Sequence, residues 1–201
     1  MMLPPIKLIK NGLILMGARL SETLTTTSID LTKSEQENKT LLVSYKNYKA
    51  QMIDDDELSS SKSLIIDTTF PYFEIEYFNQ LKKAIKEEGY KIVILDDLNT
   101  LINDSQYDNS YSKDFIIRGF KQVVDEFGIS VVLNVVLPET VDERSGDKSP
   151  LLSDFNWSRQ ILEQADQIIG LYEPSMYGIA EDEDGNSVGD QVAVLTLKPT
   201  S

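Results

Sequence analysis

The sequence contains neither cysteine nor histidine. The absence of cysteine excludes disulfide bonds, and the absence of both residues removes the usual protein ligands of zinc. Without imidazole, acid–base catalysis by histidine is excluded as well. Any chemistry must therefore come from carboxylates, hydroxyls, lysine or arginine.

Positive charge and long apolar runs are also scarce. Nineteen Lys and Arg stand against 33 Asp and Glu, which gives a formal net charge of -14. This charge opposes binding to a phosphate backbone, because such binding depends on cationic side chains that release counterions. The sequence has no run of about 18 apolar residues, and Met1 to Pro5 does not resemble the start of a signal peptide. We expect a soluble cytoplasmic protein that contacts no membrane and binds nucleic acid weakly or not at all.

The order of apolar patterns predicts the fold. The chain has 201 residues, 41% of them hydrophobic, and we assign residues 1–201 to a single domain with a buried core. Strands are expected at residues 12–17, 40–45, 64–67, 91–96, 129–137, 167–172 and 192–197. A first helix is expected from the turn after residue 18 to about residue 34, and further helices are expected at 73–88, 116–127 and 157–164. Residues 99–112, after a short helical start, and 138–153 are expected to be loops. This alternation predicts the α/β class, with a mostly parallel sheet, helices on both faces and an antiparallel C-terminal hairpin that turns at Asp184 and Gly185.

The run from Lys91 to Asp97 gives the clearest functional signal. Four consecutive apolar residues end in carboxylates, which indicates a buried strand whose carboxyl end opens on a site. Ligands of open α/β sheets bind at that end, and an acidic residue there commonly holds magnesium beside a nucleotide phosphate. Asp96 is therefore a candidate magnesium ligand. The alternative is that Asp96 only caps the end of the strand.

A phosphate-binding loop would lie between the first strand and the helix that follows it. Such a loop needs a glycine that lets the backbone approach the phosphates, a lysine that neutralises them and a hydroxyl that reaches the metal. In residues 18–26, which follow Gly17, the hydroxyl is present but there is neither a glycine nor a lysine.

Three segments, over nearly the whole chain, resemble the C-terminal RecA-like motor domain of DnaB-type replicative helicases. Residues 17–21 resemble the opening of that family's phosphate loop, with Leu20 where proline is usual. Residues 64–69 and 91–98 resemble two of its strand ends, and residues 144–166 resemble its basic loop and the Ser-Asp segment after it. The resemblance implies a RecA-like, three-layer αβα P-loop NTPase fold and a role in DNA replication.

The departures from that family fall on its catalytic positions. Its Gly-Lys-Thr falls on Thr23, Leu24 and Thr25, and its catalytic glutamate falls on Lys46. Its sensor glutamine falls near Val136, and its trans-acting lysine and arginine fall around residues 198–200. The resemblance therefore implies a vestigial nucleotide site, formed by Arg19, Ser21, Thr25, Thr26 and Lys198, with Asp96 as the magnesium ligand.

The DNA-contacting loops of the family are also changed. In the family, two loops carry cations toward single-stranded DNA, whereas residues 99–112 here contain no Lys or Arg. The second loop offers Arg144 and Lys148 among four carboxylates, at residues 139, 142, 143 and 147. These two cations are the candidate DNA contacts, in a loop that should repel a phosphate backbone. Because the family's N-terminal domain and linker helix are not recognised in the sequence, we expect a monomer or dimer and no closed ring.

Three interpretations are left open by the sequence. The first is a pseudo-ATPase with no firmly assigned cofactor, which contacts a protein partner such as a replicative helicase or another replication protein. The second is a divergent but active ATP-dependent DNA helicase, which requires ATP, magnesium and a relocated lysine such as Lys33 or Lys46. The third is an unrelated α/β binding protein that shares only the fold. For single residues, Arg19 alternatively pairs with a surface carboxylate, and Thr25 is alternatively a helix N-terminal hydroxyl.

Overall fold

The structure is a computed structural model that describes residues 6–34, 38–44, 64–67, 75–103, 109–182, 184–189 and 191–198. Its strands are β1 (Leu13–Ala18), β2 (Thr40–Ser44), β3 (Leu64–Asp67), β4 (Ile92–Asp96), β5 (Ser130–Val136), β6 (Gln167–Tyr172) and β7 (Ala193–Lys198). Its helices are α1 (Ser21–Ser34), α4 (Ile75–Glu88), α5 (Leu98–Asn103), α6 (Asn109–Phe127), α7 (Thr140–Glu143) and α8 (Arg159–Leu162), with two 3-10 turns, η1 (Leu152–Phe155) and η2 (Pro174–Tyr177). Every strand that the sequence predicts is present.

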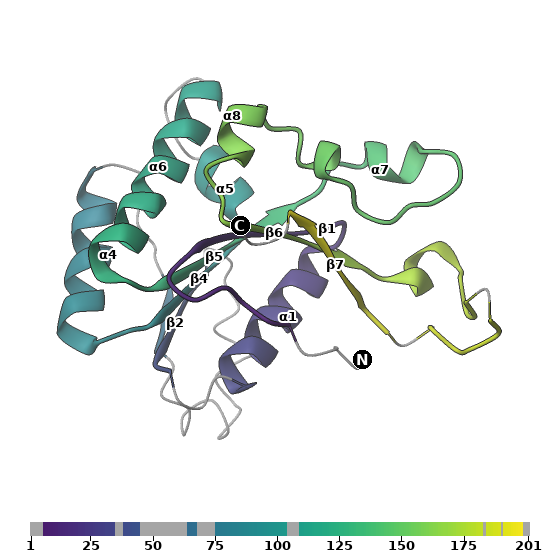
Figure 1. Cartoon of the computed structure of the whole chain (residues 1–201), viewed down its shortest axis with the longest axis horizontal. Helices are drawn as coiled ribbons and strands as arrows, with labels where there is room; N and C mark the ends of the chain where they lie inside the picture. The colour runs from purple at the N-terminus through teal and green to yellow at the C-terminus, as the bar shows by residue number, and fades with distance from the viewer. Residues whose placement is uncertain are drawn as a thin grey trace.

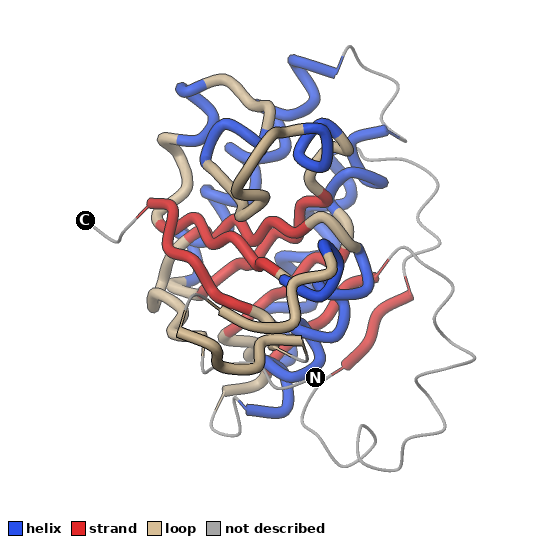
Figure 2. The backbone as a smooth tube through the Cα atoms, turned by 90° about the vertical axis from the view of Figure 1, so that its right-hand side faces the viewer, coloured by secondary structure: helices blue, strands red, loops and turns tan. Residues whose placement is uncertain are grey.

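The strands form one sheet in the order β3-β2-β4-β5-β1-β6-β7. Neighbouring strands are parallel as far as β6, and β7 runs antiparallel to β6. In Figure 1, α5, α6 and α8 lie above the sheet and α1 lies below it. β7 is the last strand at one edge of the sheet, whose strands are red in Figure 2. The predicted three-layer α/β fold with an antiparallel C-terminal extension is therefore confirmed.

The residues of β1 enter two cores on opposite faces of the sheet. Leu13 and Leu15 belong to the core that also contains residues of α4, α5 and α6, and Ile14 and Met16 belong to the core beside α1. All four side chains are 0% exposed. This is expected of a central parallel strand, because helices cover both of its faces. Because β1 lies inside the sheet, between β5 and β6, the start of α1 lies at the carboxyl end of the sheet.

The helices α4 and α6 pack together through aromatic side chains and end at glycines. Phe78 and Phe120 meet edge to face, with ring centroids 5.2 Å apart. Gly119 lies against the Phe78 ring, so that a Cβ atom at Gly119 would overlap it. Gly89 and Gly128, which follow the two helices, have φ of 72° and 58°, as expected of helix C-terminal glycines.

Two segments predicted as loops contain helices. The sequence indicates a helix from residue 116, but α6 begins at Asn109, because no proline or glycine between residues 109 and 118 stops the helix from extending. The predicted loop at 138–153 contains α7 and the start of η1. Conversely, the helix predicted at 157–164 covers Arg159–Leu162, because the Ser158 hydroxyl accepts the Ile161 N–H at 3.3 Å and caps its start.

A long connection, and not a tight turn, joins β6 to β7. Within it, the Asp182 carboxylate accepts the backbone N–H groups of Asp184 and Asn186 at 3.0 and 2.8 Å, and Gly185 has a φ of 79°. The predicted turn at Asp184 and Gly185 is therefore present inside the connection. Among the helices of the described ranges, none is long and apolar enough to cross a bilayer.

Candidate nucleotide site

The connection between β1 and α1 is short. It consists of Arg19 and Leu20, because α1 already begins at Ser21. A phosphate-binding loop of the GxxxxGK[ST] type has four residues before its second glycine, and their backbone N–H groups surround the anion. Here two of the four equivalent residues, Ser21 and Glu22, belong to the helix, and the Leu24 N–H donates to the Leu20 carbonyl at 3.4 Å. The backbone of this turn is therefore arranged as a helix start and not as a phosphate cradle.

Thr23 and Leu24, which the sequence analysis assigns to the glycine and lysine of the phosphate loop, are buried. Leu24 is 1% exposed and packs in the core between α1 and the sheet. Thr23 is 4% exposed, and its hydroxyl donates to the Glu173 carboxylate at 2.9 Å. Glu173 follows β6, so the carboxyl end of that strand brings a negative charge to the place where phosphate would have to bind. A carboxylate at this position repels phosphate.

Thr25 and Asp96 come together at the carboxyl end of β4. The Thr25 hydroxyl lies 2.9 Å from Asp96 Oδ2 and 3.0 Å from the Ser21 carbonyl. On the other side, the Asn134 amide of β5 donates to Asp96 Oδ1 at 3.2 Å and to the Ser28 hydroxyl at 2.8 Å. All of these side chains except that of Ser21 are buried. The cluster joins α1, β4 and β5 in one polar network inside an apolar core.

The oxygen atoms of this cluster fit a magnesium ion in type and spacing. Magnesium binds oxygen at about 2.0–2.1 Å with octahedral geometry, which puts adjacent ligands about 2.9 Å apart. Thr25 Oγ1 and Asp96 Oδ2 are separated by 2.9 Å. In the described part of the chain, the buried Asn134 Oδ1 has no hydrogen-bond partner, and a metal-bound water could satisfy it. The residues at the metal position therefore fit the ion, whereas the residues at the phosphate position do not fit a phosphate.

Neighbouring threonines of α1 should respond oppositely to removal of their hydroxyls. Thr27 is 0% exposed, and its hydroxyl has no partner among the residues that the structure describes, whereas the Thr25 hydroxyl bonds to Asp96. We expect Thr27→Val to raise the free energy of unfolding by about 1 kcal/mol, because a buried unsatisfied hydroxyl is removed. Thr25→Val should lower it by about 1.5–3 kcal/mol, because a hydrogen bond to a charged group is lost. Urea denaturation of both variants measures the difference; equal effects would contradict the assignment.

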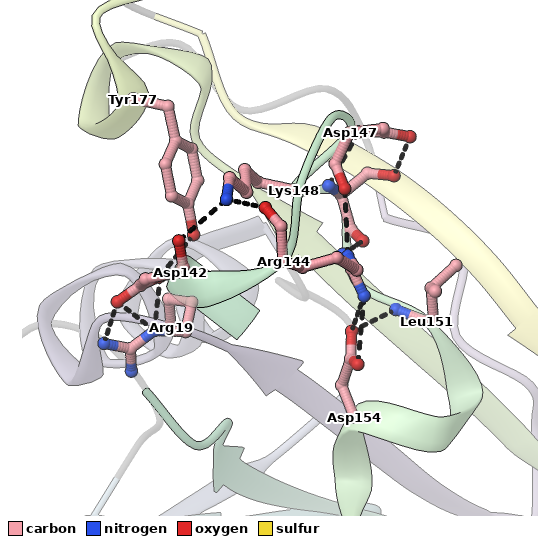
Figure 3. A network of polar contacts seen from close by, with 9 residues as sticks. Arg19, Asp142, Arg144, Asp147, Lys148, Leu151, Asp154 and Tyr177 are labelled. Atoms are coloured by element: carbon pink, nitrogen blue, oxygen red, sulfur yellow. Dashed lines mark hydrogen bonds and ion pairs between the residues drawn. The ribbon is translucent and has the colours of Figure 1, made fainter. Parts of the chain in front are cut away.

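Arg19 is held by a carboxylate on α7, as Figure 3 shows. Its Nε lies 2.9 Å from Asp142 Oδ1, its Nη2 lies 2.6 Å from Asp142 Oδ2, and its Nη1 donates to the Leu137 carbonyl at 2.8 Å. The Tyr177 hydroxyl donates to the same carboxylate at 2.8 Å. The bond from Arg19 lowers the pKa of Asp142, with a further contribution from Tyr177, and the same ion pair raises the pKa of Arg19. Arg19 therefore pairs with a carboxylate, as the simpler sequence interpretation proposes.

Tyr177 should titrate well above the ordinary range of tyrosine. Burial, followed by the hydrogen bond to Asp142, raises the pKa of Tyr177 to about 12. Since the folded-state pKa is above the unfolded one, the stabilisation is complete below about pH 10 and is lost as the pH rises through about 12. The difference between the ultraviolet titrations of the wild type and Tyr177→Phe should show a single transition near pH 12. A transition near pH 10 would contradict the contact.

The side chains around this turn leave almost no space. The residues that surround this space include Thr23, Lys148, Glu173 and Tyr177. Its volume is about 10 Å³, which is about the minimum that holds one water molecule. Tyr172 and Tyr177 stack at its edge, with ring centroids 5.8 Å apart and planes inclined by 21°. The chain's own side chains therefore fill the space beside the β1–α1 turn.

Residues 15–198 match the family model described as the DnaB-like helicase C terminal domain. The chain belongs to this family. No match is found among curated protein sequences.

Solved structures confirm the fold of the DnaB-like domain. One described as an ATPase domain has a TM-score of 0.70 and 20% sequence identity, and the match covers 94% of this chain and 81% of the other. A DnaB-like replicative helicase, described with its interactions with primase, has a TM-score of 0.69 and 19% identity, with 93% of this chain and 55% of that chain covered. A KaiC-like protein from the archaeon Pyrococcus horikoshii OT3 has a TM-score of 0.56 and 11% identity, with 81% and 71% covered. This chain thus spans about half of the similar helicase, and the likeness establishes a RecA-like fold.

The two candidate DNA contacts of the DnaB-like domain hold their own loop (Figure 3). Arg144 binds the Asp154 carboxylate at 3.0 Å and the carbonyls of Asp147 and Ser149 at 2.9 and 2.5 Å. Lys148 donates to the carbonyl of Asp142 at 2.7 Å and to that of Arg144. The structure therefore places both cations in contacts within residues 142–154. A hydrogen bond of this kind leaves less of the charge available to a phosphate backbone.

The remaining candidate residues do not gather at one site. Lys198 reaches the C-terminal end of α8, where it donates to the carbonyls of Leu162, Glu163 and Ala165 at 3.3, 3.0 and 2.5 Å. Cations favour this end of a helix because its carbonyls are unpaired. Ser21 contributes its carbonyl to Thr25, and Thr26 is exposed on α1. The site that forms thus contains Thr25 and Asp96, whereas Arg19 contacts Asp142 and the Leu137 carbonyl.

Of the two relocated lysines that an active enzyme could use, Lys33 does not lie at the phosphate position. Lys33 lies in the last turn of α1, which is about 12 Å along the helix from Thr25 at 1.5 Å per residue. Lys46 lies outside the described residues. The sequence resemblance puts the sensor glutamine near Val136. The backbone N–H and C=O of Val136 bond to the Asn99 side chain, at 2.9 and 3.2 Å.

Several site residues were missed in the sequence. Asn134 had a usable signal, because it is the polar residue within the apolar run of β5. Asp97 also had one: its carboxylate accepts the N–H of Thr100 at 3.2 Å and caps α5, which is common for Asp at a helix start. Asp142, Glu173 and Tyr177 had no such signal, since their partners lie 35 or more residues away.

Proposed function

We propose that this DnaB-like domain is a pseudo-ATPase that serves as an interaction or structural module in DNA replication. The proposal rests on Leu24, which is 1% exposed at the position of the family's phosphate-binding lysine. Losing a charged donor weakens phosphate binding by about 1.5–3 kcal/mol. Losing one preorganised donor to the transition state lowers a rate about 10²–10³-fold.

The surroundings of Leu24 support the same proposal. Glu173, bonded to Thr23, adds a carboxylate beside the turn, and Arg19 is paired with Asp142. A nucleotide would have to displace both contacts and separate the side chains that leave about 10 Å³ between them. Each of these changes adds to the cost of binding.

A protein partner is part of the proposal. One similar DnaB-like helicase is described with its interactions with primase. We infer a partner of the same kind for this domain, such as a replicative helicase or another replication protein. The net charge of -14 and the internal contacts of Arg144 and Lys148 support weak binding to nucleic acid and a monomer or dimer.

A divergent ATP-dependent DNA helicase is the second candidate. The contact of 2.9 Å between Thr25 and Asp96 favours it, because the pair fits magnesium. This function requires a cation at the phosphates in place of Leu24.

The first experiment measures ATP binding and turnover by the purified chain. We expect ATP hydrolysis equal to that of a buffer blank, and no heat of binding in a calorimetric titration with ATP and magnesium, because the phosphate half of the site is lost. Asp96→Asn is the matched control, since it keeps the shape of the metal position and removes its charge. A steady turnover that survives further purification and disappears in Asp96→Asn would establish the second candidate instead.

A further inference from the structure

A separate hollow of about 180 Å³ lies at the carboxyl end of β5, between α5, α6 and the segment after η1. It shares no lining residue with the space beside the β1–α1 turn. Its walls include Val135 and Val136 of β5, Ile102 of α5 and Phe155 of η1. Ligands of open α/β sheets bind outside the carboxyl ends of the strands, which is where this hollow lies.

Six of the nine described residues that line the hollow are apolar, and the other three are Asn99, Lys113 and Asn156. Asn99 is fixed by two hydrogen bonds to the backbone of Val136, at 2.9 and 3.2 Å. Trp157 meets the buried Phe155 edge to face, with ring centroids 6.4 Å apart and planes inclined by 71°. Pro138 and Ile102 add further apolar surface. Such walls favour a flat apolar body of about the size of one ring.

Lys113 carries the one charged side chain among the described residues that line the hollow. The chain has 33 Asp and Glu against 19 Lys and Arg, but among the residues that the structure describes no carboxylate lines the hollow beside Lys113. The Lys113 ammonium, the Asn156 side-chain amide and the Trp157 indole N–H have no hydrogen-bond or ion-pair partner in the described part of the chain. Asn156 has a φ of 50°, a left-handed conformation that asparagine tolerates better than most residues. A lysine in a hollow that no described carboxylate lines favours an anion.

We propose that this hollow binds a small aromatic carboxylate. An apolar cavity of about 150 Å³ holds benzene, so the 180 Å³ here suits one ring with a carboxylate attached. The ring would lie against Trp157 and the apolar walls, and the carboxylate would accept hydrogen bonds from Lys113 and Asn156. The inference does not depend on whether the domain binds nucleotide.

Trp157 makes the test direct, because it is the one tryptophan of the chain. Its fluorescence is recorded during titrations with sodium benzoate, with benzamide, which has the ring without the charge, and with sodium acetate, which has the charge without the ring. We expect saturation with benzoate at a Kd on the order of 0.1–1 mM, and binding at least about tenfold weaker for the other two.

Variants separate this hollow from the rest of the surface. Lys113→Gln should weaken benzoate binding about tenfold, whereas Lys86→Gln makes the same charge change on the exposed face of α4 and should have no effect. Trp157 also lines a second hollow near Lys198, so a signal unchanged in Lys113→Gln would come from there and would overturn the proposal. Absence of saturation up to about 10 mM benzoate, or equal binding of benzamide, would overturn it too. Tighter binding of oligothymidylate that depends on Lys113 would assign the hollow to single-stranded nucleic acid instead.

Discussion

Asp96→Ala is expected to lower the free energy of unfolding by about 2–4 kcal/mol in the absence of magnesium. Asp96 is 2% exposed, and its two oxygens accept hydrogen bonds from Thr25 and Asn134. Removing the carboxylate takes the acceptor from two buried donors on different elements and leaves a small cavity beside them. Urea denaturation followed by circular dichroism measures the loss.

The sign of this effect separates the two candidate functions. If the Asp96 carboxylate has a structural role, it stabilises the fold. If its role is to bind an ion that is absent, it is an uncompensated buried charge, and its removal is neutral or stabilising. Asp125→Ala on the exposed face of α6 is the matched control and should change stability by less than about 0.5 kcal/mol. An unchanged or higher stability for Asp96→Ala would favour the divergent ATPase.

Gly119→Ala is expected to destabilise the domain, although alanine usually favours a helix by about 1 kcal/mol over glycine. The new Cβ would overlap the Phe78 ring, which also packs against Phe120 across the α4–α6 contact. Overpacking of a buried contact costs about 1–3 kcal/mol, which outweighs the helix preference. Thermal denaturation of the variant measures the net loss.

A double-mutant cycle tests the cause of that loss. In a Phe78→Leu background the ring is absent, so Gly119→Ala should become neutral or stabilising, with a coupling energy of about 1–3 kcal/mol. The control is Gly189→Ala, since a Cβ at Gly189 meets no atom within 4 Å. A loss of the same size in both backgrounds would show that the Phe78 ring is not responsible.

Most of the fold could be predicted because the strands are encoded locally. β1 and β4 are continuous apolar runs, which only a sheet covered on both faces can bury, and Gly89 and Gly128 mark the ends of two helices. The start of α6 was misplaced because its first turns lack the apolar spacing that identifies a helix. Helix formation there depends on continuation from the apolar part of α6.

The site could be predicted only where one residue carried the signal. Asp96 is a candidate because it ends a buried strand, and Leu24 is singled out by its place in the sequence motif. The Arg19–Asp142 pair joins residues 123 positions apart, and the Thr23–Glu173 contact joins residues 150 positions apart. Such contacts depend on which strands lie side by side. The order of strands in the sheet cannot be inferred from the spacing of neighbouring residues in the sequence.

The central position of β1 has a consequence for folding during synthesis. Its neighbours in the sheet are β5, which begins at Ser130, and β6, which ends at Tyr172. At a synthesis rate of about 5–20 residues per second, on the order of ten seconds pass between the synthesis of β1 and that of β6. Only then are both strands that pair with β1 available. During that time its six apolar residues are an unpaired strand, which is a template for aggregation. We therefore expect that the nascent chain needs a chaperone at this stage more than the finished domain does.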